Sequence, residues 1–525
     1  MAKGDNMKLT SPERIKEIDR YAIEVLNNSA EELMKRSALA VCERVFLALA
    51  PASSAVILAG GGNNGGDGYA AAIILSEKYN VTVFDLTEEG PKTPAALFYC
   101  GKCRELAEVG GLTLKKYLPN EENERCVKDA DLIVEAALGA GAKFPPNQKL
   151  LDICRLISSS RAYKISVDIP LGINGGTGEA HKDTPVFDET VSLCFAKVGL
   201  YSYPARRFCG KITNYTLGLN SAEIEEIAGN KYTLTDFSAA KALMPKRDTA
   251  GHKGTFGKLV LAVGSEAYKG AARLALEAAL RSGVGYTVWL GEESELCSLL
   301  SEFPEAIYKK RPSFREMKSE DIEKILTECK GSAVLLGSGA GRSENLKILA
   351  EKLMAEEGPP IVLDADAINS LSENPQGAVE ILKASKRKVI LTPHPLEFAR
   401  LTGKTCEQIN QSRLTEAENF ARESRTVVVL KGAATVVTDG EKTYINSSGS
   451  TALAKAGSGD VLAGALSSLV ASAYGSSPLV ELAALAVFAH GTAADRLEEE
   501  YSVLGVTPSD LPKEIAKVYS SLQNS

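Results

Sequence analysis

Short apolar runs rich in β-branched residues alternate along this chain with longer segments of helical pattern. In the first half the runs 55–59, 81–86, 132–136 and 164–168 are predicted strands, and residues 69–78 are the predicted helix after the first of them. Strands that are buried on both faces read as continuous apolar runs, as in parallel sheets covered by helices. The pattern therefore predicts a doubly wound α/β domain.

The same alternation resumes after a charged pause at Leu219–Ser238. Beyond it the predicted strands are 258–263, 286–290, 333–336, 361–363, 388–391 and 426–430. Asp439-Gly440 between the runs 434–438 and 442–445 indicates a hairpin, and 461–472 and 480–494 have helical patterns. We predict an α/β protein of two three-layer αβα domains. They span residues 1–220 and 236–525, with a linker at 221–235.

Composition and charge narrow the class of protein. Hydrophobic residues make up 44 %, charged residues 24 %, and the net charge is −7. This balance argues against a general nucleic-acid surface, and no run approaches the length of a membrane span. The polar N-terminal stretch and the scattered cysteines are typical of a cytoplasmic protein. We expect no nucleic-acid or membrane partner, and we expect a homo-oligomer.

The first candidate site is the glycine-rich segment Gly60–Gly68, which follows a predicted strand and precedes a predicted helix. Backbone N–H groups in such a segment can face an anionic ligand. A tight turn that needs only glycine dihedrals is the alternative. Asn63, Asn64 and Asp67 favour a ligand site, because a bare turn has no need of their side-chain oxygens.

This segment, with DLIVEAALGAG from Asp131 and VDIPLGINGGTG from Val167, resembles the NAD(P)H-hydrate epimerase domains over roughly Leu9–Gly218. The resemblance implies a Rossmann-like domain that interconverts the two epimers of NADH hydrate and NADPH hydrate and holds a potassium ion. It also implies that Asp168 acts near the reacting centre. The implied substrate contacts are Asn63, Asn64, Gly65, Gly66 and Asp67, and the implied potassium ligands are Asn64 and Glu135.

Two positions depart from the family pattern at the implied potassium site. Glu135 stands where the family has aspartate, and Leu171 stands where it has serine. A glutamate can still bind the ion with a longer reach, whereas a leucine side chain has no ligand atom. Either another oxygen completes the site or the site is weakened, so an impaired epimerase domain remains an alternative.

The second candidate site is Ala456-Gly457-Ser458-Gly459-Asp460, which precedes an apolar helix. Small residues at a helix start leave N–H groups free for a phosphate. Asp460 at that start is a candidate general base for a hydroxyl that attacks phosphorus. The alternative is that it simply caps the helix.

The GSGD segment resembles the ribokinase-like superfamily. The segments 251–257, 363–367, 392–395 and 429–432 make the half from about Tyr232 onward similar to the NAD(P)H-hydrate dehydratases. The resemblance implies removal of water from the S hydrate with ADP or ATP and Mg²⁺. Asp460 would be the base, and Ala271, Gly339 and His394 would contact the hydrate. The implied nucleotide contacts are Lys431, Gly432, Ala433, Ala434, Thr435, Ser448, Gly449, Lys455, Gly457, Ser458 and Gly459.

Two other functions stay open. One is a small-molecule kinase of the same superfamily, although the glycine-rich first domain argues against it. The other is a nucleotide-binding scaffold in which one or both sites are inactive. His394, between two prolines, could also be only a rigid turn residue.

Overall fold

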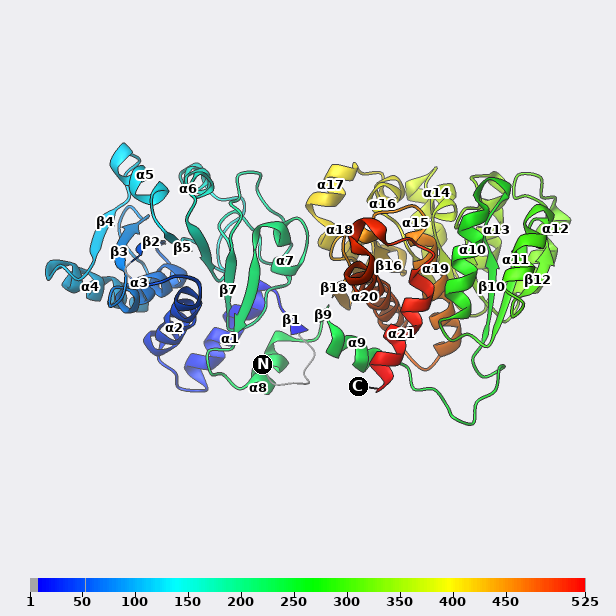
Figure 1. Cartoon of the computed structure of the whole chain (residues 1–525), viewed down its shortest axis with the longest axis horizontal. Coiled ribbons are helices and arrows are strands. Elements are labelled where there is room, and N and C mark those ends of the chain that lie inside the picture. The colour runs from blue at the N-terminus through cyan, green and yellow to red at the C-terminus, as the bar shows by residue number, and fades with distance from the viewer. Residues whose placement is uncertain (1–7, 52, 525) are drawn as a thin grey trace. The chain divides into compact units, whose positions relative to one another are not determined.

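The computed structural model describes residues 8–51 and 53–524, with the side chains of 221, 295–298 and 300 left out. The chain divides into two compact units, Lys8–Tyr232 and the part from Thr233 onward (Figure 1). Each unit has its own apolar core and its own sheet, which is parallel in the N-terminal unit and mostly parallel in the C-terminal unit.

The N-terminal unit is built on a parallel sheet with the strand order β4-β3-β2-β5-β6-β7-β8. The strands are β2 Ser54–Ala59, β3 Asn80–Asp85, β4 Thr113–Lys116, β5 Leu132–Ala136, β6 Tyr163–Val167, β7 Glu189–Leu193 and β8 Lys211–Tyr215. The order reverses between β2 and β5, which is the Rossmann-like arrangement. In open sheets of this kind ligands bind at the carboxyl ends of the strands beside the reversal.

Helices cover both faces of this sheet. They are α1 Pro12–Glu24, α2 Ala30–Ala48, α3 Asn63–Leu75, α4 Pro94–Glu108, α5 Glu121–Lys128, α6 Gln148–Ser159, α7 Val198–Tyr201 and α8 Ser221–Ala228. Alternate side chains of β2 explain the two layers. Ile57 packs into the core with α2, α3 and α4, whereas Val56 and Leu58 pack into the core with α5 and α6.

The C-terminal unit has a larger sheet with the order β9-β18-β17-β16-β15-β14-β13-β10-β11-β12. The strands are β9 Tyr232–Thr235, β10 Lys258–Ala262, β11 Tyr286–Gly291, β12 Ile307–Lys310, β13 Ala333–Leu336, β14 Ile361–Leu363, β15 Val389–Leu391, β16 Val427–Leu430, β17 Val436–Thr438 and β18 Thr443–Asn446. β10 to β16 are parallel, and β16, β17 and β18 pair antiparallel. This order reverses between β10 and β13.

The helices of this unit also form two layers. They are α9 Phe237–Leu243, α10 Lys269–Leu280, α11 Glu293–Glu302, α12 Ser319–Cys329, α13 Glu344–Ala355, α14 Asp366–Leu371, α15 Pro375–Lys383, α16 Pro395–Thr402, α17 Cys406–Gln411, α18 Arg413–Ser424, α19 Ser458–Ala473, α20 Leu479–Gly505 and α21 Leu511–Asn524. α19 is buried on nearly all sides between α10 and α20. A helix that is apolar on all sides is typical of the centre of a core. The packing of α19 there fixes the position of its first turn.

The predicted fold class, two αβα domains, is confirmed, and the main strands lie within one or two residues of their predicted positions. Three features differ. Strands β4, β7, β8 and β12 were not predicted. Helix α3 begins at Asn63, so most of the glycine-rich segment is its first turns rather than a loop. The stretch 221–235, expected as a linker, contains α8 and β9.

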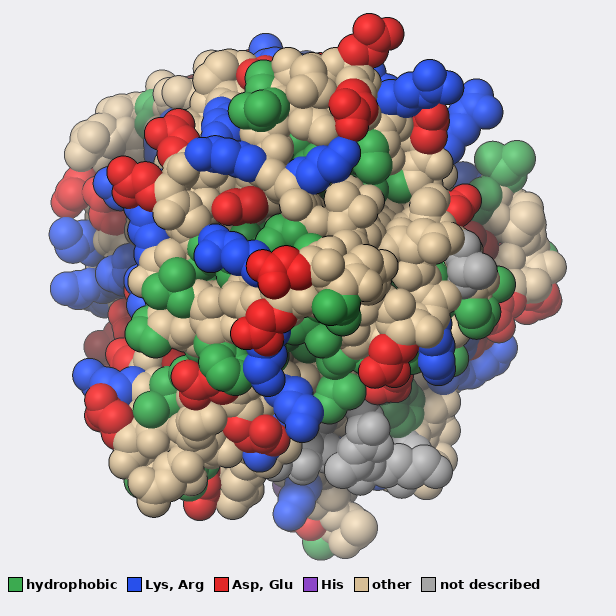
Figure 2. Space-filling model, turned by 90° about the vertical axis from the view of Figure 1, so that its left-hand side faces the viewer, with side chains coloured by type: hydrophobic (Ala, Val, Ile, Leu, Met, Phe, Trp, Pro, Cys, Tyr) green, Lys and Arg blue, Asp and Glu red, His purple; other side chains and the backbone are tan. Residues whose placement is uncertain are grey.

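Two surface properties bear on the expected partners. On the face in Figure 2, acidic and basic side chains are interspersed. None of the helices in the described part of the chain is long and apolar enough to cross a membrane.

Candidate active sites

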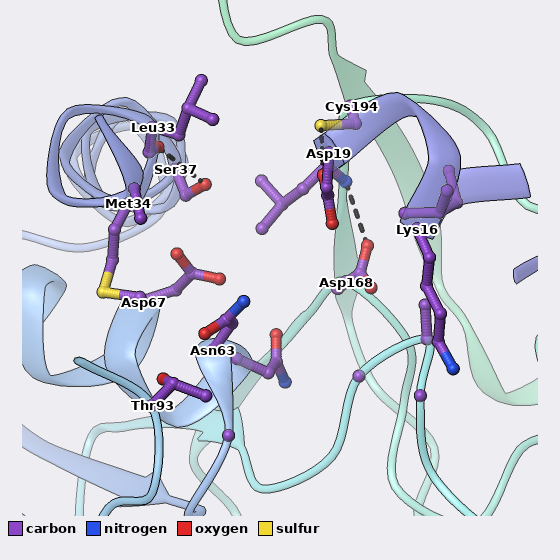
Figure 3. A pocket seen from close by; sticks show the side chains of 18 of the residues that line it. Lys16, Asp19, Leu33, Met34, Ser37, Asn63, Asp67, Thr93, Asp168 and Cys194 are labelled. Carbon is purple, nitrogen blue, oxygen red and sulfur yellow. Dashed lines mark hydrogen bonds between the residues drawn. The ribbon is translucent and has the colours of Figure 1, made fainter. Parts of the chain in front are cut away.

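A cavity of about 480 Å³ opens at the carboxyl edge of the N-terminal sheet, where the strand order reverses. The segment after β2, the segment after β5 and Asp168 after β6 form its floor, and α1 and α2 form its walls (Figure 3). The polar side chains lining it include Lys16, Asp19, Ser37, Asn63, Asn64, Thr93, Asp67 and Asp168. The sequence-predicted Asn63, Asn64, Asp67 and Asp168 are thus brought together.

Gly65 and Gly66 of the motif serve packing, whereas its polar residues line the cavity. A Cβ on Gly65 would lie 1.9 Å from the carbonyl oxygen of Gly60, and one on Gly66 would lie 2.4 Å from Cε of Met34. Neither glycine is among the residues that line the cavity. Their small size lets α3 begin against β2 and α2, and this packing turns Asn64 and Asp67 toward the cavity.

Asp168 is held in place by a buried cation. Its backbone has a positive φ of 67°, and Oδ1 accepts hydrogen bonds from Lys197 Nζ and, at 3.3 Å, from the N–H of Leu193. The Lys197 side chain is fully buried and also donates to the carbonyl oxygen of Leu193. These contacts fix the Asp168 carboxylate at the edge of the cavity.

Asp67 and Asp19 face the same cavity from other elements (Figure 3). Burial, followed by the charge of Asp168, raises the pKa of Asp67 well above its usual range. Burial likewise raises the pKa of Asp19, whose Oδ1 accepts a weak hydrogen bond from Cys194 Sγ at 3.5 Å. One cavity therefore holds an ion-paired aspartate beside two aspartates whose pKa values are raised by burial.

The implied potassium ligands lie on either side of the cavity floor. Asn64 Nδ2 donates to the carbonyl oxygens of Leu138 at 2.8 Å and Val167 at 3.1 Å. Asn64 Oδ1 is buried and has no hydrogen-bond partner in the described part of the chain. Glu135 lies below the floor on β5, fully buried, and is not a lining residue.

In the C-terminal unit the carboxyl ends of four adjacent strands meet at Asp364. Its Oδ1 accepts from Thr392 Oγ1 at 2.6 Å and from Lys431 Nζ at 3.1 Å. Its Oδ2 accepts from Ser338 Oγ at 2.8 Å. Asp364 is 1 % exposed, so this network fixes the Lys431 ammonium at the sheet edge. Burial opposes charge on Lys431, but Asp364 and Glu397 outweigh burial and raise its pKa.

The first turn of α19 lies beside that ammonium. A Cβ on Gly459 would be 3.3 Å from Lys431 Nζ. Gly457 precedes the helix with a φ of 100°, a conformation that favours glycine. Asp460 follows in the first turn. Burial and then the charge of Asp364 raise its pKa to about 7, against the lowering effect of Lys431. Ser458 Oγ is buried and unpartnered among the described residues.

The predicted hydrate contacts lie on neighbouring segments of this edge. Gly339, after β13, packs against Ala271 of α10, since a Cβ there would be 2.6 Å from that of Ala271. His394 caps α16: Nδ1 accepts from the N–H of Leu396 at 3.2 Å and of Glu397 at 3.3 Å. Its Nε2 lies 3.2 Å from Glu397 Oε1. Burial, and then Lys431, lower the pKa of His394.

The predicted nucleotide contacts outside the first turn of α19 fall into two groups. Gly432 and Ala433 are exposed beside Lys431, and Thr435 Oγ1 closes the loop by donating to the carbonyl oxygen of Gly432 at 2.8 Å. Ala434 adopts a positive φ in this loop.

Ser448, Gly449 and Lys455 are instead tied to α20. Ser448 Oγ donates to the carbonyl oxygen of Phe488 at 3.0 Å, and the N–H of Gly449 donates to Asp495 at 2.9 Å. Lys455 Nζ donates to the carbonyl oxygens of Leu504 and Val506.

The fold and the two sites define a two-domain α/β protein with one site at the sheet edge of each domain. Residues 30–199 match a family model described as YjeF-related protein N-terminus, and residues 259–517 match one described as NAD(P)H-hydrate dehydratase. A bifunctional NAD(P)H-hydrate repair enzyme of Thermofilum pendens is 30 % identical over 98 % of this chain and 97 % of its own length. The chain belongs to the family of bifunctional NAD(P)H-hydrate repair enzymes.

A second relative agrees with this assignment. The bifunctional NAD(P)H-hydrate repair enzyme of Escherichia coli is 32 % identical over 73 % of this chain and 70 % of its own. Among solved structures, the ADP/ATP-dependent NAD(P)H-hydrate dehydratase of Bacillus subtilis, co-crystallised with ATP and Mg²⁺, has 27 % identity and a TM-score of 0.47, covering 55 % of this chain and 98 % of its own.

The sequence pattern did not single out five polar residues of the first site and gave no role to two of the second. The five are Lys16, Asp19, Ser37, Thr93 and Lys197. Lys197 follows the apolar run Val191–Ala196, and predicting β7 there would have drawn attention to it. The two are Asp364, which lies in the quoted segment 363–367, and Glu397, because no sequence pattern shows that their side chains converge on Lys431.

Proposed function

We propose that this chain repairs hydrated NADH and NADPH, with dehydration of the S hydrate in the C-terminal unit and epimerisation in the N-terminal unit. The observation that carries the proposal is Asp460, a carboxylate with a pKa of about 7 at the start of α19, next to Lys431. Such a group can accept a proton at neutral pH while the helix start and the ammonium bind phosphate.

In the dehydration, Asp460 takes the proton from the ring hydroxyl of the hydrate as its oxygen attacks the terminal phosphorus of ADP or ATP. The bond from that phosphorus to the bridging oxygen breaks, and AMP or ADP leaves. Lys431 and the N–H groups of Ser458 and Gly459 balance charge on the transferred group. The ring nitrogen then expels the phosphate ester as inorganic phosphate, and loss of a proton from the adjacent carbon to water restores the reduced nicotinamide.

Roles for the remaining predicted residues follow from their places. Gly432–Thr435 and Gly457 would border the nucleotide, with Ser448, Gly449 and Lys455 nearby. Ala271, Gly339 and His394 would border the hydrate. Mg²⁺ would arrive with the phosphates and neutralise part of their charge. The described residues contain no cluster of three metal-ligating side chains, which suits an ion held mainly by phosphate oxygens.

In the epimerisation, the hydroxyl must leave one face of the ring carbon next to nitrogen and return to the other. Asp67 is suited to donate a proton to the departing hydroxyl, and Asp168, ion-paired with Lys197, is suited to accept one from the water that returns. Asn63 would help to hold the substrate. The expected homo-oligomer and cytoplasmic location stay predictions from the sequence.

The test is an absorbance assay for reduced nicotinamide, supplied with both hydrate epimers and either ADP or ATP. Full conversion of both epimers, faster than their spontaneous exchange, is the expected result. Conversion that stops after the S epimer would refute the epimerase role alone. No conversion with either nucleotide would refute both roles and favour a kinase or a scaffold.

A further inference from the structure

The Glu135 carboxylate is the buried centre of a hydrogen-bond network between β5 and β6. Oε1 accepts from the N–H of Ala137 at 2.8 Å. Oε2 accepts from Ser166 Oγ at 2.9 Å and from the N–H of Leu171 at 3.0 Å. The residue is 0 % exposed. Both oxygens are thus committed to donors of the protein itself.

These donors belong to the segments that form the cavity floor. Ala137 begins the lining segment after β5, and Leu171 lies three residues beyond Asp168 in the segment after β6. Glu135 and Ser166 are register partners on adjacent strands. The longer glutamate side chain lets one carboxylate bridge from β5 to both segments. Removing such a buried acceptor would leave several buried donors unsatisfied.

The same positions do not fit a potassium ion. A monovalent cation needs several oxygens with open lone pairs. The two Glu135 oxygens already accept three hydrogen bonds from the protein. The Leu171 side chain, 1 % exposed, packs in an apolar cluster with Leu58 and Ile133. Among the three side chains at these positions, only Asn64 offers an unpartnered oxygen within the described structure.

We propose that the N-terminal site dispenses with the potassium ion that the family resemblance implies. Glu135 holds together, by hydrogen bonds, the two floor segments that an ion would otherwise join. Asn64 Oδ1 is then free to accept a hydrogen bond from the substrate. Glu135 is a positioning residue in this arrangement. The activity part of the test below rests on the proposed epimerase function, whereas the ion-binding part does not.

The first experiment measures melting of the full chain by calorimetry in KCl and in N-methylglucamine chloride of equal ionic strength. The single tryptophan, Trp289, lies in the C-terminal unit, so the transition that its fluorescence does not follow belongs to the N-terminal unit. An ion at about 100 times its Kd would raise that transition by about 5 to 10 °C. We expect no difference between the two salts. A saturable rise in potassium alone would overturn the proposal.

The second experiment restores the family residues with Glu135→Asp combined with Leu171→Ser. The shorter carboxylate releases the N–H of Leu171, and the serine adds an oxygen, so we expect this variant to melt higher in potassium than in N-methylglucamine. The control Glu124→Asp on α5 makes the same chemical change on the surface and should show no response. A folded double variant without a potassium response would contradict the role given to Glu135. If that variant does not fold, the wild-type measurement still decides.

The third experiment follows epimerisation chromatographically in an Asp460→Asn background, where dehydration is silenced. The rate should agree within about twofold between the two salts. A loss of about tenfold or more without potassium would overturn the proposal. Absence of epimerisation in both salts would refute the proposed epimerase function, and the melting measurement would still decide the question of the ion.

Discussion

Both units place a lysine and several carboxylates at the carboxyl edge of a sheet, but the ion pairs between these side chains differ. In the N-terminal unit the buried Lys197 contacts Asp168 directly. In the C-terminal unit Lys431 contacts Asp364, which also accepts hydrogen bonds from the hydroxyls of Ser338 and Thr392. Asp460, in the first turn of α19, makes no ion pair with Lys431 within the described structure.

This difference shows how the contacts of a carboxylate determine the role that it can take in catalysis. The direct ion pair with Lys197 fixes the position of the Asp168 carboxylate, which suits a group that orients the substrate and accepts a proton from it. Asp460 has no such ion pair among the described residues, and burial together with Asp364 raises its pKa to about 7 against the lowering effect of Lys431. It can therefore gain and lose a proton near neutrality.

The largest expected effect comes from Asp460→Asn. The amide cannot accept a proton, so dehydration should fall by about 10² to 10⁴-fold, while nucleotide affinity measured by calorimetry stays close to that of the wild type. Glu499→Gln, on the exposed side of α20, is the control. Turnover within about twofold of wild type would remove Asp460 from the role of base.

Lys197→Met should affect the N-terminal unit most. It leaves the buried Asp168 without its partner, which typically costs about 3 to 5 kcal/mol. We expect the urea transition of this unit to shift accordingly and epimerisation to be lost, with dehydration unchanged. The exposed pair Arg125–Asp129 offers the control Arg125→Met. An unshifted transition would show that the pair is not important for stability.

The pH profile sharpens the comparison. A base must be ionised, so the dehydration rate should fall about tenfold per pH unit below about 7, the pKa of Asp460. Lys431→Met removes the charge that lowers this pKa, so the acid limb should move to higher pH. Lys442→Met, which alters the pair with Glu481, should not move it. An unmoved limb in Lys431→Met would refute the coupling.

Two glycine substitutions test the packing of α3. Gly65→Ala puts a Cβ 1.9 Å from a backbone oxygen, whereas Gly66→Ala meets the flexible end of Met34. Overpacking typically costs about 1 to 3 kcal/mol, and we expect Gly65→Ala to reach or exceed the upper end and Gly66→Ala to stay near the lower end. Calorimetric melting of the N-terminal unit measures both, and equal losses would contradict this reading of the contacts.

The smallest effect is expected from Lys455→Met. Its ammonium caps the carbonyl groups at the end of α20, an interaction of about 0.3 to 1 kcal/mol. We expect slightly lower stability and a change in nucleotide affinity below about twofold. A loss of affinity of about tenfold would show that the sequence-based assignment of Lys455 to the nucleotide is right and the capping role secondary.

The sequence by itself determined the fold class, the main strands and the positions of both motifs. Continuous apolar runs and the start of a buried helix at Gly457 are local properties, and local pattern is enough to place Asp168 after β6 and Asp460 at the start of α19. Short, partly exposed strands such as β4 and β12 have no such pattern, because most of their side chains face solvent.

Only the tertiary structure decided which groups meet. Lys197, in the segment after β7, contacts Asp168 in the segment after β6. Asp364 and Lys431 are far apart in the sequence but form a hydrogen bond. The structure also shows that Gly65 and Gly66 serve packing and do not line the cavity. Glu135, which was expected to bind an ion, instead forms hydrogen bonds to the segments after β5 and β6. Contacts of this kind depend on strand order and burial, which fix distances that spacing along the chain cannot.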